Sequence, residues 1–337
     1  MRLVSVTILA VLIVFSGCSS DSTSETDDST VYQSTSPVPS ALKPIPPPGR
    51  RGIRNLGTTC YLNSVLQFLM HNELVRGAFS TLPVEHSVNP VMASFLRLLQ
   101  SQWEDEGVRC IDPRGIFGAL NAFNRDLFTP NIQQDVHEAF VAIANELVRA
   151  GGPSFDLFSF ATSTALSCDN GASFNEADAQ VENQLGLVLR VPRREVFADP
   201  TLEILIQAFF QPEVIPGLVA CNRKAGVQRV LAVDSPRILV FTLNRNDFGE
   251  DKIDTPVSFP EEIDSGIVAG IADGIRYRLV GVLDHHGTSV RGGHYTANIQ
   301  IENSWWSAND SFVTPIEGGL NRVSEKAAMF FYQAIEH

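Results

Sequence analysis

Apolar side chains recur at helical spacing through the first half of the chain, between about residues 52 and 152. Such a stripe predicts a helix that packs one face against a core. Asn89-Pro90 and Asp112-Pro113 each combine a capping side chain with a proline suited to the first helical turn. Gly151-Gly152 ends the last stripe. The stripes are Tyr61, Leu62, Val65, Leu66 and Leu69; Met92, Phe95, Leu96, Leu99 and Trp103; Ile116, Phe117, Leu120 and Phe123; and Ile132, Val136, Ala139, Phe140, Ile143 and Leu147.

Beyond residue 155 the apolar period shortens toward two, in runs rich in Val, Ile and Leu. This alternation predicts strands over residues 185–191, 237–243, 277–283 and 295–301, with a short helix over residues 201–210. Helices first and strands afterwards predict an α+β protein whose helical half faces a sheet. A cleft between two such halves is the natural place for a site.

The N-terminus has the pattern of an export signal. Arg2 precedes an apolar run over residues 9–15, which is too short to span a bilayer as a permanent helix. Ser16-Gly17-Cys18 follows. The whole resembles a bacterial lipoprotein signal, in which the processed chain begins at a lipid-modified cysteine, here Cys18. A plain signal peptide with an incidental cysteine is the alternative.

The residues after Cys18 predict a tether. They are rich first in Ser, Thr, Asp and Glu and then in Pro, a composition that buries too little apolar surface to fold. We therefore expect a signal peptide over residues 1–17, a disordered tether over residues 18–51 and one folded domain over residues 52–337. Lipid chains on Cys18 would anchor the protein in a membrane. Ser19, rather than Asp, follows the cysteine, which favours the bacterial outer membrane or cell surface.

Composition supports a large folded domain and argues against nucleic acid as a partner. The chain has 337 residues, of which 44% are hydrophobic and 19% charged, and its formal net charge is −13. Nucleic acid attracts clustered Lys and Arg, so this acidity excludes it as an expected partner. Five cysteines are too few for a disulfide scaffold in a chain of this length.

Cys60 stands where a Gly/Thr turn gives way to the first predicted helix. Thr58 or Thr59 can cap that helix, because a hydroxyl accepts a backbone N–H there. A thiol in the first turn lies at the positive end of the helix dipole, which favours the nucleophilic thiolate. Taken alone, Cys60 is better explained as a small buried core residue, because buried cysteines are common.

A histidine and an amide side chain follow about 230 residues later, in the order that a cysteine protease requires. Gly292-Gly293 precedes His294 at the predicted start of a strand, which leaves room for a substrate backbone. A turn between two strands would bring Asn309 close to His294. An amide on the far ring nitrogen would fix the tautomer and orientation of the imidazole. A buried histidine satisfied by a neighbour is the alternative for His294 considered alone.

These stretches resemble the ubiquitin-specific protease family of deubiquitinating cysteine peptidases. The matching blocks are residues 52–67, 277–297 and 305–313, a QQDxHE-like block over residues 133–138, and a family-like close over residues 327–332. The resemblance extends from about residue 52 to the C-terminus. It implies an α+β papain-like fold with a helical thumb, a β palm and shortened β fingers, and no cofactor.

The resemblance also implies catalytic roles. Cys60 would be the nucleophile and His294 the general base. Asn309 would orient the imidazole, with Asp310 as a polar helper or an alternative third member. Asn55 would stabilise the oxyanion together with the backbone N–H of Cys60.

The same family pattern implies a channel for the C-terminal tail of ubiquitin. Asp135 would line it, since the arginines of that tail suit an acidic cleft. Gly292, Gly293 and Tyr295 would surround its narrow Gly-Gly end. The sequence departs from the family at Thr58, where an asparagine is usual, so the details of that turn stay open.

The fingers lack a zinc-ligand set. Most family members carry two CxxC pairs there, whereas this chain keeps only Cys168 and Cys221. Two thiolates do not complete a four-coordinate structural site, so we expect no metal. In an exported protein the two cysteines could form a disulfide if their α-carbons approach to about 4.4–6.8 Å. Two free cysteines are the alternative.

The leading functional hypothesis is a deubiquitinating thiol isopeptidase on a membrane-tethered stalk, acting on ubiquitin or ubiquitin-like conjugates. Bacteria with lipoproteins generally lack ubiquitin, so this hypothesis implies an effector exposed to host cytosol. A catalytically silent ubiquitin-binding receptor is a second hypothesis. A peptidase acting on another ubiquitin-like modifier or on a bacterial substrate is a third.

Overall fold

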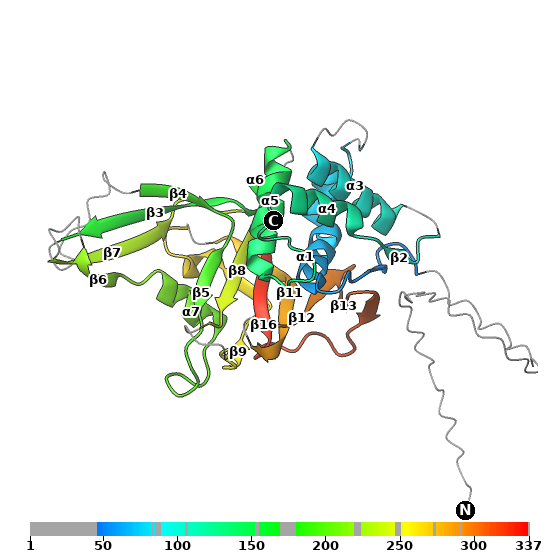
Figure 1. The fold of residues 1–337 in the computed structure, drawn as a ribbon. Helices are drawn as coiled ribbons and strands as arrows, with labels where there is room; N and C mark the ends of the chain where they lie inside the picture. Colours follow the sequence, from blue (N-terminus) through cyan, green and yellow to red (C-terminus); the bar gives the residue numbers. More distant parts are fainter. Residues whose placement is uncertain are drawn as a thin grey trace, which may run out of the picture.

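The computed structural model describes residues 46–82, 84, 89–104, 107–151, 155–168, 180–218, 224–246, 251–271, 274–289 and 292–335. The predicted signal peptide, Cys18 and most of the predicted tether lie outside these residues. A helical part lies beside a large sheet, and a second sheet extends from the far side (Figure 1). This arrangement confirms the predicted α+β class.

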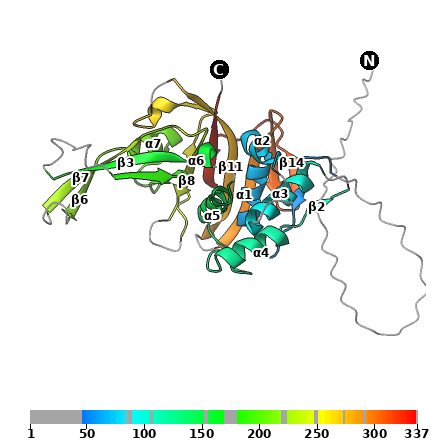
Figure 2. The same cartoon turned by 90° about the horizontal axis from the view of Figure 1, so that it is seen from above.

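The helical part is organised around the first helix, α1, all of whose residues are buried. Seen from above, α1 lies beside β11 and between the large sheet and helix α3 (Figure 2). Phe68 of α1 stacks on Phe331 of the sheet with ring centroids 3.7 Å apart. The helices are α1 (Cys60–His71), α2 (Glu73–Phe79), α3 (Pro90–Trp103), α4 (Arg114–Phe123), α5 (Val136–Arg149) and α6 (Phe155–Phe158).

Asparagine and aspartate side chains set where several helices begin. Asn89 accepts the N–H groups of Val91 and Met92, so the predicted Asn-Pro start of α3 is confirmed. The stripe predicted from Ile132 is wrong at its first residue. Helix α5 begins only at Val136, because Asp135 caps it, and Ile132 is 51% exposed.

The large sheet, which we call the palm, follows the order β14–β13–β12–β11–β16–β8–β5, with β10 paired to β11. Only β5 and β8 pair in parallel among neighbours on this path. Its strands are β5 (Leu187–Arg190), β8 (Ile238–Asn244), β10 (Glu262–Asp264), β11 (Arg276–Ser289), β12 (Gly292–Ile301), β13 (Ser304–Asn309), β14 (Phe312–Pro315) and β16 (Ala327–Ala334).

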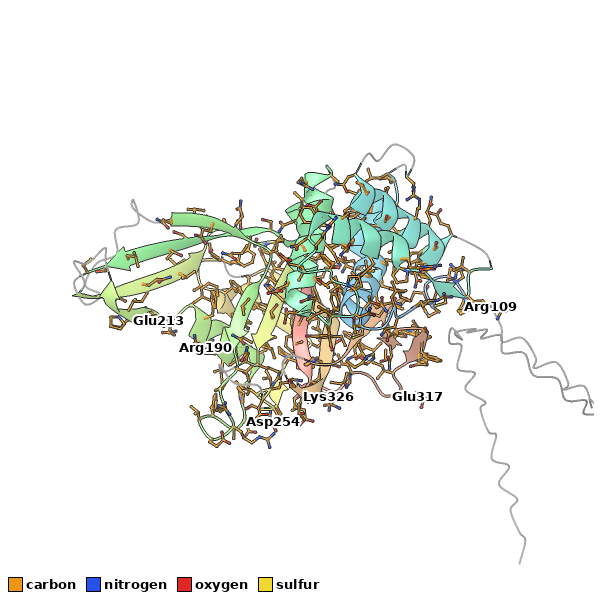
Figure 3. The ribbon with its side chains drawn as sticks, in the orientation of Figure 1. Arg109, Arg190, Glu213, Asp254, Glu317 and Lys326 are labelled. Atoms are coloured by element: carbon orange, nitrogen blue, oxygen red, sulfur yellow. The ribbon has the colours of Figure 1, made fainter. Side chains whose placement is uncertain are left out.

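Both faces of the palm are covered. Helices α1 and α5 pack on one face, where α1 contacts β12 most extensively. On the other face, helix α7 (Leu202–Phe209) contributes Leu202, Leu205 and Ile206 to a second core cluster. Figure 3 shows side chains filling the space between these layers, with Arg109 and Glu213 near opposite ends of the domain.

The second sheet corresponds to the expected fingers and has the order β4–β3–β7–β6. Its strands are β3 (Phe160–Ser167), β4 (Gln180–Gln184), β6 (Glu213–Leu218) and β7 (Lys224–Ala232). Two small pairs complete the described strands: β1 (Gly52–Ile53) with β2 (Cys110–Ile111), and β9 (Val257–Ser258) with β15 (Val323–Ser324). None of the helices in the described ranges is long and apolar enough to cross a membrane.

The tether predicted over residues 18–51 is too long at its C-terminal end. Arg51 is 1% exposed and donates hydrogen bonds to the carbonyl oxygens of Ser101 and Gln102, in the last turn of α3. The N–H of Gly49 also donates to the carbonyl of Gln102. Those terminal carbonyls have no partner within their own helix, which is why a buried arginine is accommodated there. Composition alone does not reveal this contact.

The palm approaches α1 so closely at Gly281 that a side chain would not fit. A Cβ there would lie 2.5 Å from Cδ2 of Phe68, in a layer already filled by Phe331. We expect Gly281→Ala to lower the free energy of unfolding by about 1–3 kcal/mol through overpacking. Denaturant unfolding would measure this change. The matched control is Gly118→Ala on the exposed face of α4, where nothing lies within 4 Å; it should be neutral or stabilising by up to about 1 kcal/mol. Equal stability of the two variants would contradict the close approach.

Candidate active site

Cys60 is the first residue of α1 and is 3% exposed. Neither threonine before it acts as predicted for a cap, since Thr59 occupies the N-cap position without a side-chain cap bond. Instead the Thr59 hydroxyl accepts the N–H of Leu56, at 2.9 Å. The threonine therefore holds the preceding loop, and the first N–H groups of α1 stay available at the cysteine.

Asn55 organises the loop before Cys60. Its Oδ1 accepts the N–H groups of Gly57 at 2.9 Å and Thr59 at 3.2 Å. Gly57 has φ +116°, a conformation that favours glycine. The Nδ2 of Asn55 donates to Oδ2 of Asp310 at 2.8 Å. Asn55 thus lies at the site, with one N–H committed to Asp310 and a second that a substrate oxyanion could use.

Asp310 joins the two halves of the domain beside the cysteine. Its Oδ1 accepts Nδ2 of Asn63, a residue of α1, at 2.7 Å. Its backbone carbonyl accepts the N–H of Ile53 at 2.7 Å. Asp310 itself has φ +47° in the turn between β13 and β14. Asn63 was not among the predicted site residues, although a buried asparagine on an apolar helix is a signal for such a bond.

His294 and Asn309 meet across paired strands, as the predicted hairpin requires. Strands β12 and β13 are antiparallel, and Nε2 of His294 donates to Oδ1 of Asn309 at 2.7 Å. Asp310 is more distant, with Oδ2 at 3.9 Å from the same nitrogen. The geometry therefore favours Asn309 over Asp310 as the partner of the ring, and it leaves Nδ1 for the thiol.

The sulfur of Cys60 lies against the strand that carries His294. The backbone N–H of Tyr295, the next residue, hydrogen-bonds to the sulfur. Nε2 of Gln133 is 3.9 Å from the same sulfur. Cys60, early in the sequence of the domain, thus lies against the strand that carries His294, near the end of that sequence, as a thiol–imidazole pair requires.

The resting cysteine differs from the sequence-based expectation of a thiolate. Burial raises the pKa of the Cys60 thiol, and the negative charge of Asp310 raises it further. The N–H groups of Tyr295, Tyr61 and Cys60 act in the opposite direction but do not outweigh burial. The helix start does favour the thiolate, as predicted, yet desolvation is the larger effect.

A groove of about 530 Å³ lies beside Tyr295, the residue whose backbone N–H hydrogen-bonds to the sulfur. Asp135, Glu138, Tyr295 and Lys252 are among the residues that line it. Asp135 also caps α5, because its Oδ1 accepts the N–H groups of His137 and Glu138. Asp135, which was predicted to line a tail channel, therefore lines a groove together with Tyr295.

The two glycines before His294 form the start of β12. A Cβ on Gly293 would overlap the carbonyl oxygen of His286 and lie 2.5 Å from Nε2 of His285. The His285 ring in turn packs on Tyr295, with centroids 4.5 Å apart. Gly293 is thus fixed by close packing, whereas Gly292 has open space around its Cα.

The finger cysteines are only partly described. Cys168 follows β3 and is disulfide-bonded, while Cys221 lies outside the described residues. The pairing of these two cysteines therefore stays a prediction. Within the described part of the chain, no cluster of three or more His, Cys, Asp or Glu side chains is arranged to hold a metal ion.

The sequence model of the ubiquitin carboxyl-terminal hydrolase family matches residues 51–332. Ubiquitin carboxyl-terminal hydrolase 26 of Arabidopsis thaliana is 29% identical over 317 residues, which are 85% of this chain and 29% of the relative. Ubl carboxyl-terminal hydrolase 18 of mouse is 28% identical over 298 residues, which are 79% of this chain and 78% of the relative. The chain thus spans less than a third of the Arabidopsis protein.

Solved structures share the fold. Ubp8 in a SAGA deubiquitinating module bound to monoubiquitin superposes with a TM-score of 0.71 at 20% identity, covering 88% of this chain and 73% of that one. The same module with ubiquitin aldehyde gives a TM-score of 0.70 at 20% identity, covering 86% and 70%. The expected papain-like arrangement of thumb, palm and fingers is confirmed as a fold.

The charge of Asp310 should slow the alkylation of the Cys60 thiol. Removing the charge in Asp310→Asn should lower the thiol pKa and make alkylation of Cys60 several-fold faster at neutral pH, since only the thiolate reacts. In the unaltered protein, alkylation should keep rising with pH beyond the range of an ordinary thiol. Mass spectrometry of the Cys60 peptide after timed iodoacetamide treatment measures both.

The control is Asp264→Asn, a remote carboxylate that caps a short turn through the N–H of Gly266. It should leave the alkylation profile unchanged. Slower alkylation in Asp310→Asn, with an unchanged thermal midpoint, would contradict the assignment of Asp310 as a charge that opposes the thiolate.

Proposed function

We propose, because the chain belongs to the ubiquitin carboxyl-terminal hydrolase family, that it is a cysteine-type deubiquitinase that cleaves after the C-terminal Gly-Gly of ubiquitin. The observation that carries this proposal is the meeting of Cys60 with the strand of His294, whose ring is held by Asn309. The intact nucleophile, base and orienting residue argue against a silent ubiquitin receptor.

The chemistry follows from these three side chains. His294 takes the proton of the Cys60 thiol through Nδ1, and the sulfur attacks the carbonyl carbon of the last glycine. As the tetrahedral intermediate collapses, the imidazolium gives its proton to the leaving lysine amine. Water, deprotonated by His294, then hydrolyses the thioester and frees the carboxylate. Two acyl transfers replace one difficult step.

Asn55 and the N–H of Cys60 are the proposed donors to the oxyanion. Asn55 is suited to this role because Asp310, Gly57 and Thr59 hold its amide in one orientation before substrate arrives. A donor that is already oriented costs no reorganisation in the transition state.

The groove supplies the proposed recognition of the tail. Asp135 lines it, and a carboxylate there complements arginines of a basic tail. Gly292, Gly293 and Tyr295 would flank the final glycines at the narrow end. A bulkier tail residue would meet the packed Gly293 region, so we expect selectivity for Gly-Gly.

A ubiquitin-like modifier ending in Gly-Gly is the second candidate substrate. The observation that favours it is the mouse relative, which is described as a Ubl hydrolase and which this chain matches over most of both lengths. The catalytic steps would be the same, and only the contacts with the body of the modifier would differ.

A ubiquitin probe with a C-terminal electrophile tests the proposed activity. We expect it to label Cys60 of residues 46–337, and Cys60→Ala to abolish labelling while thermal stability is kept. Asn55→Ala should reduce turnover of a fluorogenic ubiquitin amide by about 100- to 1000-fold. Labelling only by a ubiquitin-like probe selects the second candidate. Tight ubiquitin binding without labelling, or neither result, would refute a deubiquitinase.

We infer that the domain is displayed at a membrane of a bacterium, as an effector that meets host conjugates. The support is the lipoprotein-like signal ending at Cys18, followed by the Ser/Thr- and Pro-rich segment. Two or more acyl chains on one cysteine suffice for stable attachment. The acidic net charge of −13 suits display away from an anionic lipid surface.

Expression of the full chain in a lipoprotein-processing bacterium tests this location. Cys18 should incorporate labelled palmitate and hold the protein in the membrane fraction. Cys18→Ser should lose the label and release the protein, whereas the control Cys168→Ser should retain the label. Equal labelling of the two variants, or none in the unaltered chain, would refute the lipid anchor.

A further inference from the structure

Gln133 connects two parts of the site, the start of β12 at Gly293 and the sulfur of Cys60. Its Oε1 accepts the N–H of Gly293 at 3.0 Å, and its Nε2 lies 3.9 Å from the sulfur of Cys60. The orientation of this amide is determined, because a backbone N–H requires an oxygen as its acceptor. The NH₂ group therefore faces the sulfur.

The segment that carries Gln133 holds both neighbours of His294. Gln133 binds Gly293 on one side, and the N–H of Val136 hydrogen-bonds to the Tyr295 hydroxyl on the other. These contacts come from the turn before α5 and from its first residue. The loop before α5 and the first residue of α5 thus contact the residues on either side of His294, in addition to the bond between His294 and Asn309.

The adjacent glutamine makes no such contact. Nε2 of Gln134 donates to the carbonyl of Asp126 at 3.1 Å, on the exposed side of the same turn. The two consecutive glutamines therefore have different partners. One reaches the reacting sulfur and the other does not.

We propose that Gln133 is a positioning residue that fixes the Gly293–His294 segment over Cys60 and directs an amide N–H at the sulfur. Its N–H stabilises the thiolate while His294 holds the proton, and its Oε1 keeps the imidazole within reach of the sulfur. Both effects serve the attack step, so the loss of Gln133 should appear in kcat and in thiol ionisation. The choice of a ubiquitin substrate for this test rests on the proposed function.

The Cys60 sulfur needs such a donor because its other surroundings oppose the negative charge of the thiolate. Cys60 is buried, and the carboxylate of Asp310 lies close enough to act on it. The side-chain amide of Gln133 adds to the backbone N–H groups that counter these effects. A hydrogen bond to a charged group is stronger than one between neutral groups.

Two variants of Gln133 and one control test the acceptor and donor roles of its side-chain amide. Gln133→Glu keeps an acceptor for the N–H of Gly293 but replaces the donor at the sulfur with a negative charge. Gln133→Ala removes both contacts, and Gln134→Ala is the matched control. For each, the pH dependence of iodoacetamide reaction at Cys60, the kcat and KM for a fluorogenic ubiquitin amide, and the thermal midpoint would be measured.

We expect Cys60 of Gln133→Glu to be alkylated about tenfold more slowly at neutral pH, with its profile shifted to higher pH. Gln133→Ala should shift in the same direction by less, and both should lose about tenfold in kcat with KM unchanged. Gln134→Ala should match the unaltered protein in every readout.

Unchanged alkylation profiles in both Gln133 variants would overturn the proposal. A rise in KM at constant kcat would also overturn it, because it would make Gln133 a substrate contact only. If the unaltered protein does not cleave the ubiquitin amide, the proposed function fails, while the alkylation profiles still decide the role of Gln133.

Discussion

The carboxylate of Asp310 is the contact on which the site depends. It accepts the amides of Asn55 and Asn63, residues that precede it by about 250 positions, and its carbonyl accepts the N–H of Ile53. Hydrogen bonds to an ionised acceptor contribute about 1.5–3 kcal/mol each, enough to hold a polar junction between the helices and the palm. The loop before Cys60 and the turn after Asn309 are thereby fixed relative to each other.

The same carboxylate also raises the pKa of the Cys60 thiol. A negative charge near a buried thiol opposes its ionisation, so the junction that positions the site also favours a neutral resting cysteine. Donors directed at the sulfur, from the Tyr295 backbone and from Gln133, counter this effect. The site combines a rigid acidic anchor with neutral N–H donors, and the proposed mechanism uses both.

Much of the fold was predictable because its signals are local. The stripes that became α1, α3 and α4, the asparagine before Pro90, and the alternation in β8 and β12 each reflect residues near in sequence. The adjacency of His294 and Asn309 also followed from a hairpin between consecutive strands. The family motifs also pointed to Asp135, which lines a groove together with Tyr295, and to Asn55, which hydrogen-bonds to Asp310.

The failures concern contacts between distant residues. Ile132 fits a helical stripe, but a capping aspartate three positions later delays α5. Arg51 belongs by composition to a tether, yet the carbonyl ends of α3 bury it. The helix dipole at Cys60 is readable from the sequence, whereas the burial that outweighs it is a property of the packed site. The reach of Gln133 to both Gly293 and the sulfur depends on the same packing.

The central claim is that Asp310 acts on catalysis through Asn55, and a double-mutant cycle tests it most directly. The kcat/KM for a fluorogenic ubiquitin amide would be measured for Asn55→Ala, Asp310→Ala and the double variant. If Asp310 works by orienting Asn55, the double variant should be about as slow as the slower single variant, which is strong non-additivity. Rate losses that simply multiply would show that the two residues act independently, and would contradict the account.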